Sequence, residues 1–190
     1  MVSASMEPKA LVSQLNEYLS AMVECVFYFH GTLDKFIGDA VMAVWGNAHS
    51  NGVREDALNA VRAALAMRQE LRRLNQDWRA RGMPELRAGT AVNHGEVVVG
   101  NIGSTQRMEF TVIGEAVNLS WKLQEVTKQI GRDLVIGEQV VPLIGEHFDI
   151  EALGPVYLPA LEKTVNVFAI KDADLGIPVL QEEAAATVVY

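Results

Sequence analysis

The segment GTLDKFIGDAVMAVWG constrains the fold of this chain more than any other. Two apolar runs, residues 31–37 and 40–45, flank the dipeptide Gly38-Asp39. Such a dipeptide can adopt the backbone of a two-residue turn between antiparallel strands. The segment therefore predicts a tight β-hairpin that carries Lys35 in its first strand and the Asp39 carboxylate at its tip.

Helical periodicity follows on both sides of this hairpin. Apolar residues recur at helical spacing over residues 8–29 and again over residues 54–81, so both segments are predicted to be amphipathic helices. A third helix is predicted for EAVNLSWKLQEVTKQI, which Gly131 would close. Between the last two helices, ELRAGTAVNHGEVVVGNIG is typical of two strands that turn at His94-Gly95.

The order of these elements predicts an α+β sandwich with an antiparallel-rich sheet and helices packed on one face. Both faces of the first hairpin strand carry apolar bulk, because alternation places Phe36 on one side and Leu33, Lys35 and Ile37 on the other. We therefore expect a partner surface to cover the second face, with Lys35 pointing into it.

Composition excludes several classes of protein. The 190 residues carry a formal net charge of -8, which opposes attraction to nucleic acids and anionic membranes. No apolar run approaches the roughly 20 residues of a membrane span, and the first residues lack the pattern of a signal peptide. A single cysteine, Cys25, cannot form an intrachain disulfide. We expect no nucleic-acid or membrane contact and a cytoplasmic location.

The length suits one domain with a short addition. Residues 172–190 hold four acidic and no basic side chains, and we interpret them as an acidic C-terminal tail that follows a domain over residues 1–171.

A second group of polar residues lies at a predicted strand-to-helix junction, in RMEFTVIGEAVNLSWKL. Asn118 and Lys122 are four residues apart and therefore share one helix face, where an amide and a cation can bind an anion. An ordinary exposed helix face explains this spacing equally well. Taken alone, Asp39 is also explained as a turn residue and Lys35 as a solvated strand lysine.

Three motifs in this order, LDKFIGDAVMAVWG, GEVVVGNIGS and FTVIGEAVNLSWKL, closely resemble the catalytic domain of class III adenylyl and guanylyl cyclases. The resemblance extends from about Val2 to Ile170. It implies a ferredoxin-like, palm-type sandwich that works as a head-to-tail homodimer, with ATP or GTP bound between the two copies.

The resemblance also implies a role for each matching residue. Asp39 matches the second of two metal-binding aspartates, which hold Mg²⁺ or Mn²⁺ in a two-metal reaction. Lys35 and Thr111 match the two base-reading positions and form the adenine-type pair, which favours ATP. Asn118 matches the asparagine that positions the ribose, and Lys122 matches a residue that contacts the phosphates.

The sequence departs from the family pattern in three places. Lys122 replaces the usual arginine and loses its bidentate fork. Pro159-Ala160 replaces a frequent Lys-Gly pair. The family's first strand, with its Phe-x-Asp-Ile motif and first metal aspartate, is expected before Val2 and is not in this sequence, which is compatible with a shortened chain, a mis-assigned start or a degenerate cyclase.

The leading hypothesis is an adenylate cyclase that converts ATP to 3′,5′-cyclic AMP and pyrophosphate in signal transduction, with sensory domains possible in a longer protein. The alternative is a catalytically impaired, cyclase-like module that binds nucleotide or only dimerises. A diguanylate cyclase is a weaker third hypothesis, because its Gly-Gly-Asp/Glu-Glu-Phe signature is missing.

Overall fold

The computed structural model describes residues 7–47 and 49–171. The predicted helices and the first hairpin are found close to their expected bounds. The elements are α1 (Pro8–Tyr28), β1 (Thr32–Ile37), β2 (Ala40–Val44), α2 (Val53–Ala80), β3 (Thr90–Val92), β4 (Val98–Ser104), β5 (Arg107–Ile113), α3 (Glu115–Ile130), β6 (Leu134–Gly137), η1 (Glu138–Val140), α4 (Val141–Ile144), β7 (Ile150–Leu158), η2 (Pro159–Leu161) and β8 (Lys163–Ile170).

The strands form one four-stranded sheet, in the order β3-β6-β8-β7, and two separate hairpins, β1-β2 and β4-β5. All neighbouring strands pair antiparallel except β3 and β6, which are parallel. The predicted antiparallel-rich α+β fold class is confirmed, although the strands are distributed over three sheets.

Helices cover both faces of the four-stranded sheet, so the expectation of helices on one face was wrong. Strand β6 explains the difference, because all four of its residues are buried. Leu134 and Ile136 pack with α2 and α4, whereas Val135, which alternation points the other way, packs with α3. A short, continuously apolar strand of this kind is typical of two-sided burial.

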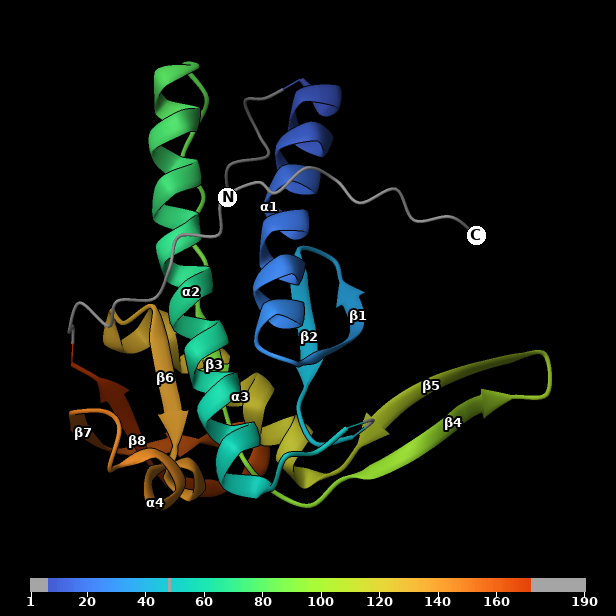
Figure 1. Cartoon of the computed structure of the whole chain (residues 1–190), viewed down its shortest axis with the longest axis vertical. Coiled ribbons are helices and arrows are strands. Elements are labelled where there is room, and N and C mark those ends of the chain that lie inside the picture. The colour runs from blue at the N-terminus through green and yellow to red at the C-terminus, as the bar shows by residue number, and fades with distance from the viewer. Residues whose placement is uncertain (1–6, 48, 172–190) are drawn as a thin grey trace.

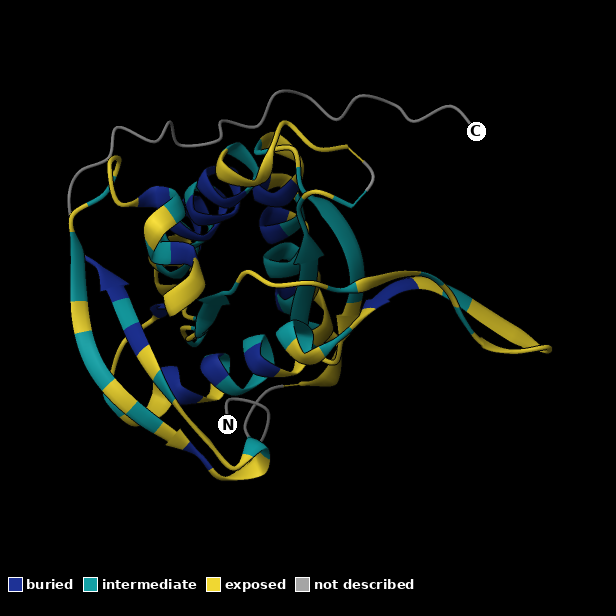
Figure 2. Cartoon of the chain, turned by 90° about the horizontal axis from the view of Figure 1, so that it is seen from below, coloured by how far each residue is buried: buried dark blue, intermediate teal, exposed yellow. Residues whose placement is uncertain are grey.

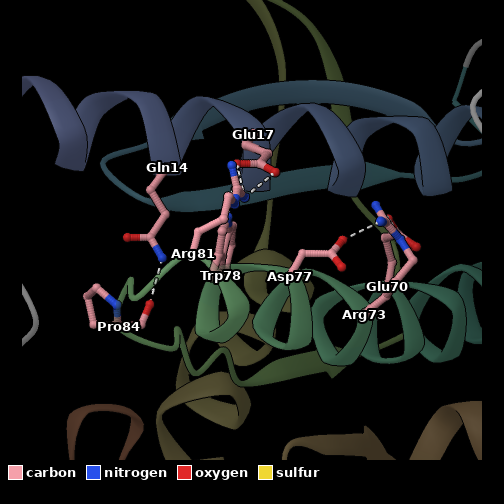
Figure 3. Close-up of polar contacts among 8 residues, drawn as sticks. All are labelled: Gln14, Glu17, Glu70, Arg73, Asp77, Trp78, Arg81 and Pro84. Carbon is pink, nitrogen blue, oxygen red and sulfur yellow. Dashed lines mark hydrogen bonds and ion pairs between the residues drawn. The ribbon is translucent and has the colours of Figure 1, made fainter.

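Helices α1 and α2 lie side by side (Figure 1), with Met22, Leu74 and Trp78 buried between them. Polar contacts fix their relative position at one end (Figure 3). The indole N–H of Trp78 donates to Glu17 Oε2 at 2.9 Å, and Arg81 donates to both oxygens of the same carboxylate. Burial opposes ionisation of Glu17, but these two donors lower its pKa overall.

The β4-β5 hairpin projects away from the rest of the domain (Figure 1). The predicted pairing of strands across His94-Gly95 was wrong, because β3 pairs with β6 and β4 pairs with β5. The intervening segment is fixed against α3 instead. Asn93 donates from Nδ2 to the carbonyl of Ala116 at 3.0 Å.

The β1-β2 hairpin turns at Gly38-Asp39, as predicted, with Ile37 opposite Ala40. Gly38 has φ +63°, which glycine adopts without steric strain at the first central position of such a turn. The predicted acidic tail, residues 172–190, lies outside the described residues. Within the part that is described, no helix is both long and apolar enough to cross a membrane.

Candidate active site

Lys35 and Thr111, the two expected base-reading residues, lie together where β1 meets β5. Lys35 Nζ donates to Glu109 Oε2 at 2.8 Å and lies 3.8 Å from Asp34 Oδ2. The Thr111 hydroxyl donates to the same Asp34 oxygen at 2.8 Å. Two strands that are distant in the sequence are therefore joined by one lysine, one hydroxyl and two carboxylates.

A β-bulge makes this arrangement possible. The pairing of β1 with β2 shifts between Leu33 and Lys35, so Asp34 is the extra residue of the bulge. Strict alternation would send Asp34 and Lys35 to opposite faces, but a bulge re-aims the side chains around it. Both side chains reach β5, where Glu109 and Thr111 are two residues apart and so share a face.

The ion pair changes the acidity of both partners. The hydrogen bond to Glu109, which outweighs desolvation, raises the pKa of Lys35. The hydrogen bonds from Lys35 and then Arg107 lower the pKa of Glu109. The side chain of Lys35 is 30% exposed. The ammonium is therefore held charged in a place that a ligand can reach.

Asn118 and Lys122 lie on one face of α3, as the spacing predicted. Asn118 is exposed. Lys122 Nζ lies 3.0 Å from each oxygen of Glu125, one turn further along the helix. Near the start of the helix, Lys163 from β8 pairs with Glu115 at 3.0 Å. The helix that carries Asn118 therefore also carries two ion pairs, one within α3 and one between α3 and β8.

Asp39 lies apart from these residues, exposed at the tip of its hairpin. Its charge is felt by Tyr18 of α1, whose pKa is raised to about 12, first by burial and then by Asp39. The described residues contain no group of three or more His, Cys, Asp or Glu side chains that could hold a metal. A single carboxylate still fits Mg²⁺, which is often bound by one or two carboxylates together with substrate phosphates.

The structure thus brings the predicted residues together in two pairs, Lys35 with Thr111 and Asn118 with Lys122, and leaves Asp39 separate. Sequence reasoning missed Asp34, whose side chain is only 4% exposed. Its signal was present as a carboxylate inside an otherwise apolar strand. Only the bulge shows that this carboxylate shares a side with Lys35.

A family model for the adenylate and guanylate cyclase catalytic domain matches residues 1–172. The chain belongs to this family. Cyclase domains of the family are phosphorus-oxygen lyases and generally depend on divalent metal ions.

Similar proteins include both adenylyl and guanylyl cyclases. The chain is 30% identical to an adenylate cyclase of Anabaena cylindrica over 177 residues, which is 90% of this chain and 34% of that protein. This chain therefore spans about a third of the length of the Anabaena cylindrica protein.

Two solved structures have the same fold as this cyclase domain. The adenylyl cyclase CyaB from P. aeruginosa superposes with a TM-score of 0.81 at 31% identity, covering 90% of this chain and 87% of that one. The guanylyl cyclase Cya2 superposes with a TM-score of 0.79 at 29% identity, covering 89% and 84%. One of these structures is of an adenylyl cyclase and the other is of a guanylyl cyclase. Similarity of fold therefore does not distinguish ATP from GTP as the substrate of this domain.

Proposed function

We propose that this domain is an adenylate cyclase that converts ATP to 3′,5′-cyclic AMP and pyrophosphate at the interface of a head-to-tail homodimer. The observation that carries the proposal is the position of Lys35 beside Thr111, joined through Asp34 in a domain of the cyclase family. A lysine placed at N1 of the base can only donate, which suits the N1 acceptor of adenine and not the N1–H donor of guanine.

In the proposed reaction the ribose 3′-oxygen bonds to the α-phosphorus. The bond from that phosphorus to the bridging oxygen breaks, the hydroxyl proton is lost, and pyrophosphate leaves. The exposed amide of Asn118 would orient the ribose, since holding two reacting atoms in line removes much of the entropic barrier. Lys122, on the same helix face, would leave Glu125 to neutralise charge that develops on the phosphates.

Asp39 is the carboxylate that we assign to Mg²⁺ or Mn²⁺. When bound, divalent ions would activate the ribose 3′-hydroxyl and neutralise the triphosphate. The exposed position of Asp39 at a hairpin tip supports this assignment, because its oxygens stay available to an ion shared with the substrate.

Exposed apolar side chains support a homodimer. Phe36 and Ile37 on β1, and Val98, Met108, Phe110 and Ile113 on the projecting hairpin, are all exposed. On the projecting hairpin they lie on both faces, because Val98 pairs with Ile113 whereas Phe110 pairs with Asn101. Exposed apolar surface of this kind is typical of interaction sites. A second copy of this chain would cover these side chains and would bring Asp39 of one copy toward Asn118 of the other.

Mixing two inactive variants tests the whole proposal. Asp39→Ala and Asn118→Ala should each lower cyclic AMP formation by at least about 100-fold. In a head-to-tail dimer these residues serve one site from different copies, so a mixed dimer keeps one intact site. Equal mixing should restore about a quarter of wild-type activity, because half of the dimers are mixed and one of their two sites works.

No recovery in the mixture, with both variants folded and dimeric, would contradict the shared site. Cyclic GMP as the preferred product of the wild-type chain would contradict the choice of ATP.

Two observations favour a second candidate, a cyclase-like module with impaired catalysis. Lys122 is engaged by both oxygens of Glu125, and Pro159 provides no cation at the start of η2. On this hypothesis the chain binds ATP but forms little product, and Lys122→Arg would raise turnover by providing the bidentate fork. This candidate would be excluded if the wild-type chain had high turnover and Lys122→Arg did not change it.

A further inference from the structure

Asp34 is the buried member of the cluster that it forms with Lys35, Glu109 and Thr111, and the proposed reaction does not use it. Its side chain is 4% exposed, yet it lies in a strand whose neighbouring residues are apolar or half exposed. Its oxygen Oδ2 accepts the Thr111 hydroxyl at 2.8 Å and lies 3.8 Å from Lys35 Nζ. One buried carboxylate oxygen therefore touches both residues that would read the base.

The contact fixes the direction of the Thr111 hydroxyl. An ionised carboxylate can only accept hydrogen bonds, so the single hydroxyl hydrogen of Thr111 has to point at Asp34. The lone pairs of Thr111 Oγ1 remain, and the residue can then act only as an acceptor toward a ligand. Lys35 beside it can act only as a donor.

An acceptor at the 6-position of a purine and a donor at N1 match adenine and mismatch guanine. Adenine offers an N6 amino donor beside the N1 acceptor, whereas guanine offers the O6 acceptor beside an N1–H donor. With Thr111 as the acceptor at the 6-position and Lys35 as the donor at N1, both atoms of adenine are paired. Both atoms of guanine would face a group of the same kind, and unpaired polar groups in a recognition site are costly.

No side chain projects from β4 directly opposite Thr111. Its partner across the β4-β5 hairpin is Gly100, and a Cβ at that glycine would meet nothing within 4 Å. Directly opposed residues of an antiparallel pair project to the same face. The space next to the Thr111 hydroxyl is therefore left open by the absence of a side chain on β4.

We propose that Asp34 is a specificity-determining positioning residue, which selects ATP over GTP by holding the Thr111 hydroxyl as an acceptor. The inference rests on the proposed function, since it assigns Lys35 and Thr111 to the base. Asp34 acts through Thr111 and does not touch the substrate.

The test is a double-mutant cycle with Asp34→Asn, Thr111→Val and the combination. The amide introduced by Asp34→Asn has the shape of the carboxylate but can also donate, so Thr111 is no longer restricted to accepting. Asp34→Ala is a second variant that releases the hydroxyl altogether. Asp149→Asn is the control, because Asp149 is an exposed aspartate whose side chain pairs with Lys171, the residue after the end of β8.

Two experiments are made on each variant: calorimetry gives the affinities for ATP and GTP, and steady-state kinetics gives kcat and KM for both nucleotides. Asp34→Asn should lower the preference for ATP about tenfold, the value of one hydrogen bond. The change should fall on affinity and KM more than on kcat, because the base is remote from the reacting atoms. In the Thr111→Val background, Asp34→Asn should change the preference no further.

An equal loss for both nucleotides, or the same loss in the Thr111→Val background, would overturn the inference and leave the proposed function intact. A wild-type chain that binds ATP but turns over neither nucleotide would overturn the proposed function, while the affinity ratios still decide on Asp34. Failure to bind either nucleotide would overturn both.

Discussion

The four-stranded sheet and the two hairpins differ in how far their apolar side chains are buried. In the sheet, β6 is buried on both faces by α2 and α3. On the projecting hairpin, Val98 is 65% and Phe110 is 62% exposed. Figure 2 shows this contrast, with exposed residues along most of the hairpin and buried ones on the helices that face the core.

This contrast suggests that the residues that stabilise the domain are different from those of the candidate active site. Residues such as Leu123 and Val135 stabilise the folded domain, because their apolar side chains are removed from water by packing within one chain. The residues that we propose read the base, and Asp39, lie instead on the hairpins, where a single chain leaves apolar surface uncovered. A site there would be accessible to substrate, and a second copy that covers the hairpins would complete it.

The largest expected effect is on catalysis without loss of stability. Asn118→Ala should lower kcat about 10²–10³-fold, as the loss of one preorganised transition-state contact does. The free energy of unfolding should change little, because Asn118 is exposed. Cyclic AMP formation and denaturant unfolding measure the two effects. Gln129→Ala, also exposed on α3, is the control and should alter neither.

A core substitution is expected to have the opposite effect, lowering stability and leaving the active site unchanged. Leu123→Ala, at a residue that is 1% exposed, should lower the free energy of unfolding by about 2–5 kcal/mol through lost burial and a cavity. Below the unfolding transition, KM for ATP should stay close to that of the wild type. A tenfold rise in KM in the folded variant would mean that the core and the site are not separate.

The exposed apolar residues should matter for assembly and little for folding. Phe110→Ala should raise the Kd of the homodimer at least about tenfold, since burial of each phenylalanine side chain contributes about 1.5–3 kcal/mol. Sedimentation over a range of concentrations measures it, and specific activity should become dependent on concentration. Val12→Ala, at an equally exposed apolar residue on α1, is the control. An unchanged Kd for Phe110→Ala would remove this hairpin from the interface.

The smallest expected effect is on the pKa of Tyr18 in α1, which the charge of Asp39 influences. Burial and the Asp39 charge raise the pKa of Tyr18 to about 12, so Asp39→Asn should lower this pKa. Because the folded-state pKa is raised, the associated stability is complete below the ordinary tyrosine pKa, about 10, and is lost as the pH rises through about 12. The phenolate absorbance, compared with Tyr18→Phe, measures the titration, and Asp149→Asn should leave it unchanged.

Local patterns in the sequence predicted the elements well. Helical periodicity gave α1, α2 and α3, and Gly38-Asp39 gave the first hairpin, because these signals depend on neighbouring residues and on backbone preferences. The spacing of Asn118 and Lys122 placed both on one helix face, and both lie on α3. The roles of Lys35, Thr111, Asn118 and Lys122 came from the resemblance to the cyclase family and stay predictions.

The errors concern contacts between residues distant in the sequence. Apolar residues of β3 pair with β6 and not with the next strand, and α3 covers the sheet face opposite α2. Both arrangements depend on which surfaces bury one another, and several partners satisfy the same local pattern. The covering of the open hairpin face by a second copy remains a prediction.

The sequence by itself determined that this domain has a hairpin with a lysine and a tip aspartate, amphipathic helices and the motifs of a cyclase. Tertiary structure alone decided that Asp34 joins Lys35 and Thr111. The physical reason is the bulge: one extra residue in β1 reverses the direction that alternation assigns, and nothing local in the sequence marks where that residue is inserted.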